Sequence, residues 1–88
     1  MKISEIAVVP IREKIDGHCA MVSFLLDKTF FMGSIALYRR PDGSFRLVFP
    51  TKKIGNTHLN IYHPITKQAT QKIEAAVFPY AEKLLNKN

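Results

Sequence analysis

The 88-residue sequence is poor in cysteine, in long apolar runs and in acidic residues. Its single cysteine, Cys19, has no partner for an internal disulfide, which is typical of a protein from a reducing cytoplasm. No apolar run approaches the roughly 18 residues that a membrane helix needs, and Glu5 stands where a secretory signal would remain apolar. We therefore expect a cytoplasmic protein without a membrane partner.

The sequence also lacks the groups of reactive side chains that catalysis or metal binding requires. Its acids are scattered singly among bases, so no carboxylate pair stands out for general acid–base work. Cys19 lies in an apolar stretch, where an inert buried thiol is the more common role. His58 and His63 have no third metal ligand nearby, and there is no glycine-rich phosphate loop. We expect no enzymatic activity, no cofactor, no metal and no small-molecule substrate.

What the sequence does contain is an excess of basic residues, 13 Lys+Arg against 7 Asp+Glu. The whole net charge of +6 belongs to residues 39–72, because the bases and acids outside this stretch cancel. The stretch holds one acid, Asp42, and seven bases: Arg39, Arg40, Arg46, Lys52, Lys53, Lys67 and Lys72. Such asymmetry favours an anionic partner, nucleic acid first, over the alternative of a surface charged only for solubility.

Turn signals and alternating apolar residues predict four strands in succession. The turns are Asp16-Gly17, Asp27-Lys28 and Pro41-Asp42-Gly43. The strands cover residues 2–12, 18–27, 30–38 and 45–49, and Pro10 places the first strand at an edge or a bulge. Residues 51–57 predict an exposed loop, and residues 59–62 a possible short fifth strand. Phe45 and Phe49 could stack on RNA bases, but core packing is the more common role for such residues.

From residue 67 onward the apolar spacing changes to three and four, which predicts an amphipathic helix with Thr66 as its N-cap. Pro79 predicts a bend near residue 75, or a break and a restart. The fold class is therefore α+β, an antiparallel meander of four to five strands followed by one C-terminal helix, in a single domain over residues 1–88. Both faces of strand 18–27 are apolar and one helix covers one face, so we expect a homodimer.

The order of the strands predicts two basic clusters. Arg39 and Arg40 end the third strand and Arg46 begins the fourth, so these arginines share one end. Lys52 and Lys53 lie at the other end, about 20 Å away at the usual strand rise. If residues 59–62 run back beside the fourth strand, Lys67 and Lys72 return to the arginine end.

Four segments in this order, SFLLDKTFFMGSIALY, LVFPTKK, HPI and KIEAAV, resemble the stage V sporulation protein G (SpoVG) family over about residues 2–85. The most specific parts are Pro50-Thr51-Lys52-Lys53 and His63-Pro64-Ile65. Members of that family are described as small bacterial cytoplasmic regulators of sporulation and septation that bind DNA and RNA as dimers, without catalytic activity. The resemblance implies the same function here, with Lys52 and Lys53 matching the family's proposed nucleic-acid-contacting segment.

We therefore predict a dimeric regulator that binds DNA, or RNA as the second candidate, mainly through phosphate contacts. The contacts are expected from Arg39, Arg40, Arg46, Lys52, Lys53 and Lys67. The alternative is a protein-interaction module at the cell-division machinery, whose charge engages an acidic protein. A membrane surface is a poorer partner, because residues 73–85 carry Lys83 alone against Glu74 and Glu82.

Overall fold

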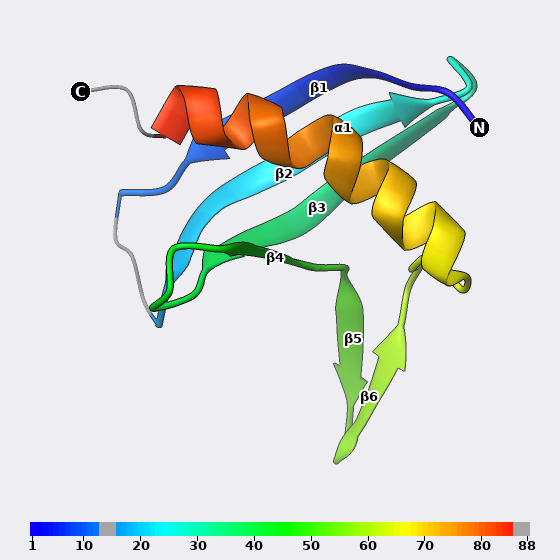
Figure 1. The fold of residues 1–88 in the computed structure, drawn as a ribbon. Helices are drawn as coiled ribbons and strands as arrows, with labels where there is room; N and C mark the ends of the chain where they lie inside the picture. Colours follow the sequence, from blue (N-terminus) through cyan, green and yellow to red (C-terminus); the bar gives the residue numbers. More distant parts are fainter. Residues whose placement is uncertain (13–15, 86–88) are drawn as a thin grey trace.

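The computed structural model describes residues 1–12 and 16–85, which form a four-stranded antiparallel sheet, a separate hairpin and one C-terminal helix (Figure 1). The sheet has the order β1-β2-β3-β4, and the hairpin pairs β5 with β6. The bounds are β1 Ile3–Pro10, β2 His18–Leu26, β3 Phe30–Arg39, β4 Phe45–Val48, β5 Thr51–Ile54, β6 Thr57–Asn60 and α1 Lys67–Leu85. The predicted α+β class, with its meander and final helix, is confirmed.

Tight turns bring the strands of the meander together. Asp16 and Gly17 both have positive φ, 53° and 84°, in the turn that leads into β2. Gly17 is required there, because an added Cβ would lie 2.6 Å from the carbonyl oxygen of Arg39. The Arg39 amide donates to Gly17 O over 2.8 Å, so this turn is tied to the end of β3. Pro10 ends β1, an edge strand, as its missing N–H predicts.

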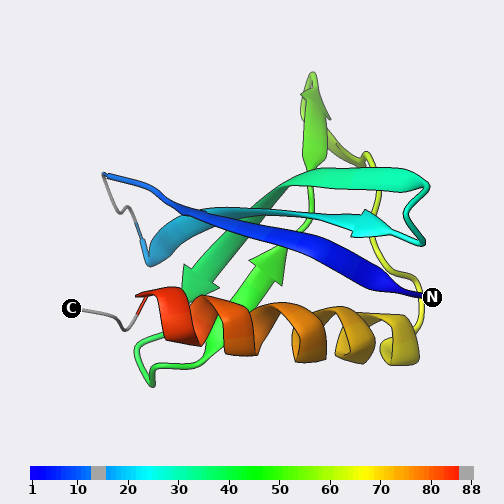
Figure 2. The same ribbon diagram turned by 90° about the horizontal axis from the view of Figure 1, so that it is seen from above.

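The core lies between α1 and one face of the sheet, and the other face carries no helix among the described residues (Figure 2). α1 contributes Ile73, Val77 and Ala81 to the core. The largest fully buried side chains are Phe24, Ile35, Leu37, Val22 and Val77. Phe45 is also buried and its ring lies 5.7 Å from that of Phe78, so the core role predicted for Phe45 is confirmed.

α1 is one continuous helix, which excludes one of the two alternatives at Pro79, the break and restart. Thr66 is confirmed as the N-cap, because its hydroxyl accepts a hydrogen bond of 3.0 Å from the Ala69 amide. Pro79 lies on the exposed side of the helix, where water can bind the carbonyl that its missing N–H leaves unpaired. Val77 and Ala81, on either side of it, are fully buried against the sheet. No helix of the described residues has the length and apolar character needed to cross a bilayer.

Residues 51–60 form a protruding ribbon, which we call the β5–β6 arm. The predicted loop at residues 51–57 is wrong, because Thr51–Ile54 is a strand that pairs with Thr57–Asn60. The fifth strand predicted at residues 59–62 lies instead at Thr57–Asn60, and it pairs with β5 and not with the sheet. Pro50 lacks the N–H that would extend β4, and Gly55, with a φ of 61°, turns the chain back. Ile61 N donates to Pro50 O over 3.0 Å, which closes the base of the arm.

Candidate nucleic-acid interface

The β5–β6 arm is the most exposed part of the described chain. Every residue from 51 to 60 is exposed. The arm leaves the sheet after β4 (Figure 1), and Figure 2 shows it extending on the side of the sheet opposite α1. A narrow ribbon that projects in this way can enter a groove that the body of the domain could not.

The arm has two chemically different faces, because neighbouring strand residues point to opposite sides and directly paired residues share a side. The register pairs Thr51 with Asn60, Lys52 with Leu59, Lys53 with His58 and Ile54 with Thr57. One side, the polar face, carries Thr51, Lys53, His58 and Asn60. The other side, the apolar face, carries Lys52, Ile54, Thr57 and Leu59; Ile54 is 54% exposed and Leu59 48%. Lys52 and Lys53 therefore point in opposite directions.

Sequence reasoning missed His58 and Asn60 as interface residues. Their place opposite Lys53 and Thr51 follows from the β5–β6 register, which no single segment shows by itself. A signal for the turn was present, because Gly-Asn between β-branched residues is a hairpin pattern.

The three arginines lie at one end of the sheet, as predicted, but they do not form one surface. The Arg39 guanidinium lies over the Phe45 ring, 4.6 Å from its centroid, and so sits on the side of the core. Arg46 is paired with Tyr38 and follows Phe45 directly, so it belongs to the opposite face. Arg46 is exposed there and is the arginine best placed to meet a partner on the side to which the arm extends.

Arg40 is held within the turn between β3 and β4. Its Nη1 donates to Ser44 Oγ over 3.3 Å and to Phe45 O over 3.2 Å. In the same turn the Ser44 hydroxyl and amide both donate to Asp42, at 2.7 and 2.9 Å. These hydrogen bonds, with a smaller contribution from the charge of Arg40, hold the pKa of Asp42 below its ordinary value. An ionised Asp42 therefore offsets part of the positive charge at this end.

The expectation that Lys67 and Lys72 return to the arginine end is wrong. Phe78, in the second half of α1, packs on Phe45 at the arginine end, so the helix begins at the opposite end of the sheet (Figure 1). The physical reason is that β6 folds back on β5 and delivers the chain to Pro50, beside the end of β4. Lys67 and Lys72 are exposed, and the helix that carries them starts near the base of the arm.

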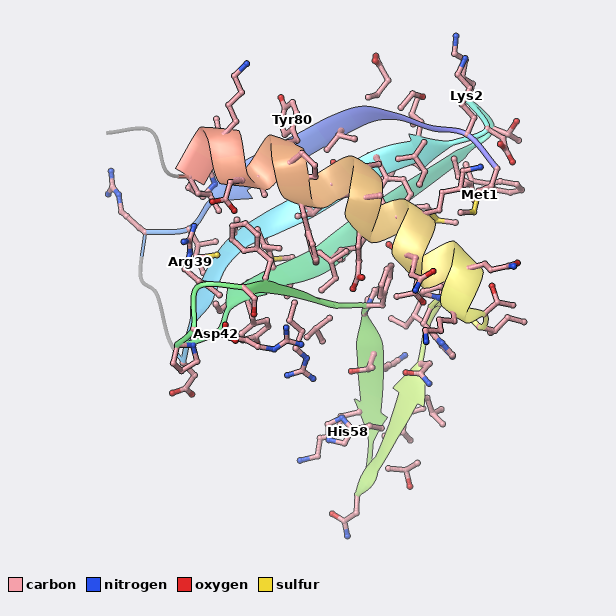
Figure 3. All side chains as sticks on the ribbon, in the orientation of Figure 1. Met1, Lys2, Arg39, Asp42, His58 and Tyr80 are labelled. Carbon is pink, nitrogen blue, oxygen red and sulfur yellow. The ribbon has the colours of Figure 1, made fainter. Side chains whose placement is uncertain are left out.

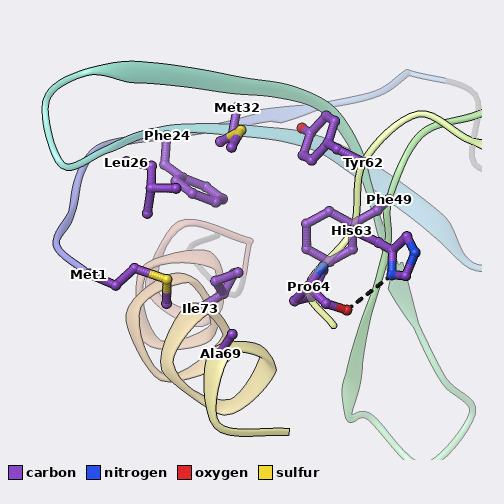
Figure 4. A pocket seen from close by; sticks show the side chains of 10 residues that line it. All are labelled: Met1, Phe24, Leu26, Met32, Phe49, Tyr62, His63, Pro64, Ala69 and Ile73. Carbon is purple, nitrogen blue, oxygen red and sulfur yellow. Dashed lines mark hydrogen bonds between the residues drawn. The ribbon is translucent and has the colours of Figure 1, made fainter. Parts of the chain in front are cut away.

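A small apolar pocket lies between the start of α1, the sheet and residues 62–64 (Figure 4). It has a volume of about 160 Å³, and Phe24, Met32, Phe49 and Ile73 are among its lining residues. The Tyr62 hydroxyl, whose pKa is raised by burial, donates to Gly33 O. At the rim, His63 Nδ1 and Pro64 O are hydrogen-bonded at 3.0 Å. The pocket thus offers apolar contact, which suits no anionic partner.

The described residues were also compared with the requirements of a metal site, and the chain with known proteins. Within residues 1–12 and 16–85, no three side chains of His, Cys, Asp or Glu lie close enough together to hold a metal ion. Cys19 is buried, and its Sγ contacts Leu37 O at 3.5 Å. The chain matches no protein-family model and no curated protein. The resemblance to the SpoVG family therefore stays a prediction.

Proposed function

We propose that the protein is a cytoplasmic nucleic-acid-binding regulator that holds the phosphate backbone through its exposed lysines and arginines. The observation that carries this proposal is the β5–β6 arm, which is wholly exposed and contains Lys52 and Lys53 but no acid. Within the described residues neither lysine takes part in an ion pair. Cations presented in this way bind phosphates by releasing counterions.

The resemblance to the SpoVG family supports the same function, because it singles out Lys52 and Lys53 independently of the fold. It also implies that the outcome of binding is regulatory, in sporulation, septation or gene expression. The arm adds to this implication a physical means by which the two lysines reach a partner.

Binding should weaken steeply with salt. If each of the six predicted cations neutralises one phosphate, the logarithm of the association constant falls with that of salt concentration with a slope near −5. Arg39 and Arg40 already contact Phe45 and the β3–β4 turn. If the other four cations alone neutralise phosphates, the slope is about −3.6. These four are Arg46, Lys52, Lys53 and Lys67. Fluorescence anisotropy of a labelled duplex between about 50 and about 200 mM salt measures it. No binding at low salt would instead favour the protein-interaction module.

We also propose that two chains pair through β1 and β2 on the face of the sheet opposite α1, away from Arg46 on β4. This face carries Val9, Met21 and Leu25, which alternate with residues buried on the helix side. Val9 is 60% exposed in the single chain. An exposed apolar patch is typical of a protein–protein contact, because its burial removes apolar surface from water. A second copy related by two-fold symmetry supplies the same apolar patch as its partner.

Light scattering should give a particle of twice the 10.0 kDa chain mass at micromolar concentration. Val9→Glu should shift the particle toward the single-chain mass, because it buries an unpaired charge at the contact. Gln68→Glu, an equal change of charge in the exposed first turn of α1, is the control and should leave the mass unchanged. A wild-type particle of 10.0 kDa would contradict the dimer.

A further inference from the structure

We infer that the β5–β6 arm enters the major groove of B-form DNA with its polar face toward the base edges. The inference rests on the proposed function and adds to it a binding mode, a contact face and a preferred form of nucleic acid. It assigns the polar face, Thr51, Lys53, His58 and Asn60, to the bases. The apolar face, with Lys52, points away from them.

The shape of the arm fits this groove. The major groove is about 12 Å wide and admits a two-stranded ribbon. Paired strands lie about 4.8 Å apart, so a ribbon with its side chains fills the width. The turn at Gly55-Asn56 makes the tip narrow, and every residue of the arm is exposed along its length. The hydrogen bond between Ile61 N and Pro50 O, 3.0 Å long, fixes the base of the arm on the domain.

The chemistry of the polar face fits base edges. Lysine donates to the O6 and N7 atoms of guanine, asparagine can bond the N6 and N7 atoms of adenine, and threonine can bond or contact several bases. Lys53, Asn60 and Thr51 share one side of the ribbon by register. On the opposite side Lys52 and Thr57 can hydrogen-bond a base edge, but Ile54 and Leu59 cannot.

A further cation lies on the side of the sheet to which the arm extends. His58, a member of the polar face, projects sideways from the arm (Figure 3). Arg46, which is exposed, comes from the start of β4 and lies on the face of the sheet opposite α1. A duplex whose groove receives the arm can therefore meet Arg46 with its backbone, and phosphate contacts of this kind fix the register of the protein.

The same geometry selects B-form DNA over double-stranded RNA. The major groove of A-form RNA is deep and narrow, and side chains cannot read it. A ribbon that binds through that groove must therefore lose affinity when the DNA duplex is replaced by an RNA duplex of the same sequence.

The adjacent pair Lys52 and Lys53 supplies a matched test, because both are exposed and each loses one charge when changed to Gln. Lys53→Gln should weaken binding to a fluorescent DNA duplex about fivefold to 150-fold, the range of one base contact. Lys52→Gln should have a clearly smaller effect. Sequencing of duplexes bound from a random DNA pool should show a base preference that Asn60→Ala loses at one position and Lys52→Gln keeps. Circular dichroism confirms that each variant is folded.

Equal losses for the two lysines, or equal affinity for DNA and RNA duplexes, would overturn the groove inference. Either result would leave the proposed function standing, because phosphate contacts alone give both. Binding restricted to single strands would likewise overturn the inference only. Failure of the wild-type protein to bind any of these nucleic acids would refute the proposed function itself.

Discussion

Excision of the β5–β6 arm is expected to abolish nucleic-acid binding without unfolding the domain. Replacing residues 51–60 by Asn-Gly joins Pro50 to Ile61, whose backbone O and N are already hydrogen-bonded at 3.0 Å. A two-residue Asn-Gly turn suits such a closure. The excision removes Lys52, Lys53 and the whole polar face, so the affinity for a DNA duplex at low salt should fall by at least about 100-fold.

The fold should survive because every residue removed is exposed. Thermal melting by circular dichroism should therefore change little, and anisotropy with the labelled duplex measures the loss of binding. A variant that keeps the arm but carries Lys52→Gln and Lys53→Gln separates the charge of the arm from its shape. If the excised protein binds as tightly as the full chain, the interface lies at the arginine end and the arm plays no part.

The main sheet could be predicted because its signals are local. Asp16-Gly17 and Asp27-Lys28 are turn residues, and all four adopt a positive φ, 84° for Gly17 and 52° to 53° for the other three. The N-cap at Thr66 and the helical spacing after it are equally local. The fold class therefore followed from short segments read one at a time.

The β5–β6 arm could not be predicted in the same way, because its strands are stabilised by pairing with each other and bury little. Residues such as Thr51, Lys52 and Lys53 have the polarity of a loop, and a ribbon exposed on both sides lacks the pattern of a half-buried strand. Whether β6 pairs with β4 or with β5 depends on the whole chain. Pairing of β6 with β4 would place Lys67 and Lys72 at the arginine end, whereas its pairing with β5 places them at the opposite end.

The candidate site was predicted by residue type but not by face. Lys52 and Lys53 stand out as an exposed basic pair in the sequence, yet the register turns them to opposite sides of the arm. Arg39 and Arg46 share an end but not a face, since Arg39 pairs with Phe45 and Arg46 with Tyr38. A face depends on the parity of a register, and a slip of one residue would reverse it. Sequence reasoning therefore identifies the cations and leaves their grouping to the structure.

Truncation of Phe24 to alanine is expected to remove a large share of the protein's free energy of unfolding. Phe24 is 2% exposed, in the inner strand β2, and packs between the sheet and α1. Removing such a ring lowers the free energy of unfolding by about 3–5 kcal/mol. An 88-residue domain has a free energy of unfolding of only about 4–13 kcal/mol. Urea denaturation followed by circular dichroism should show this loss, and the melting temperature should fall by at least about 12 °C.

Phe30→Ala is the matched control, because it removes the same ring from a position that is 60% exposed. Phe30 is paired with Leu26 and so lies on the helix side of the sheet, away from the proposed dimer contact. A surface truncation should change the free energy of unfolding by no more than about 0.5 kcal/mol. Equal costs for the two variants would contradict the core position of Phe24. Phe24→Ala should lower stability without removing a contact residue, whereas arm excision should remove the contact residues from a folded chain, so the two experiments separate stability from contact.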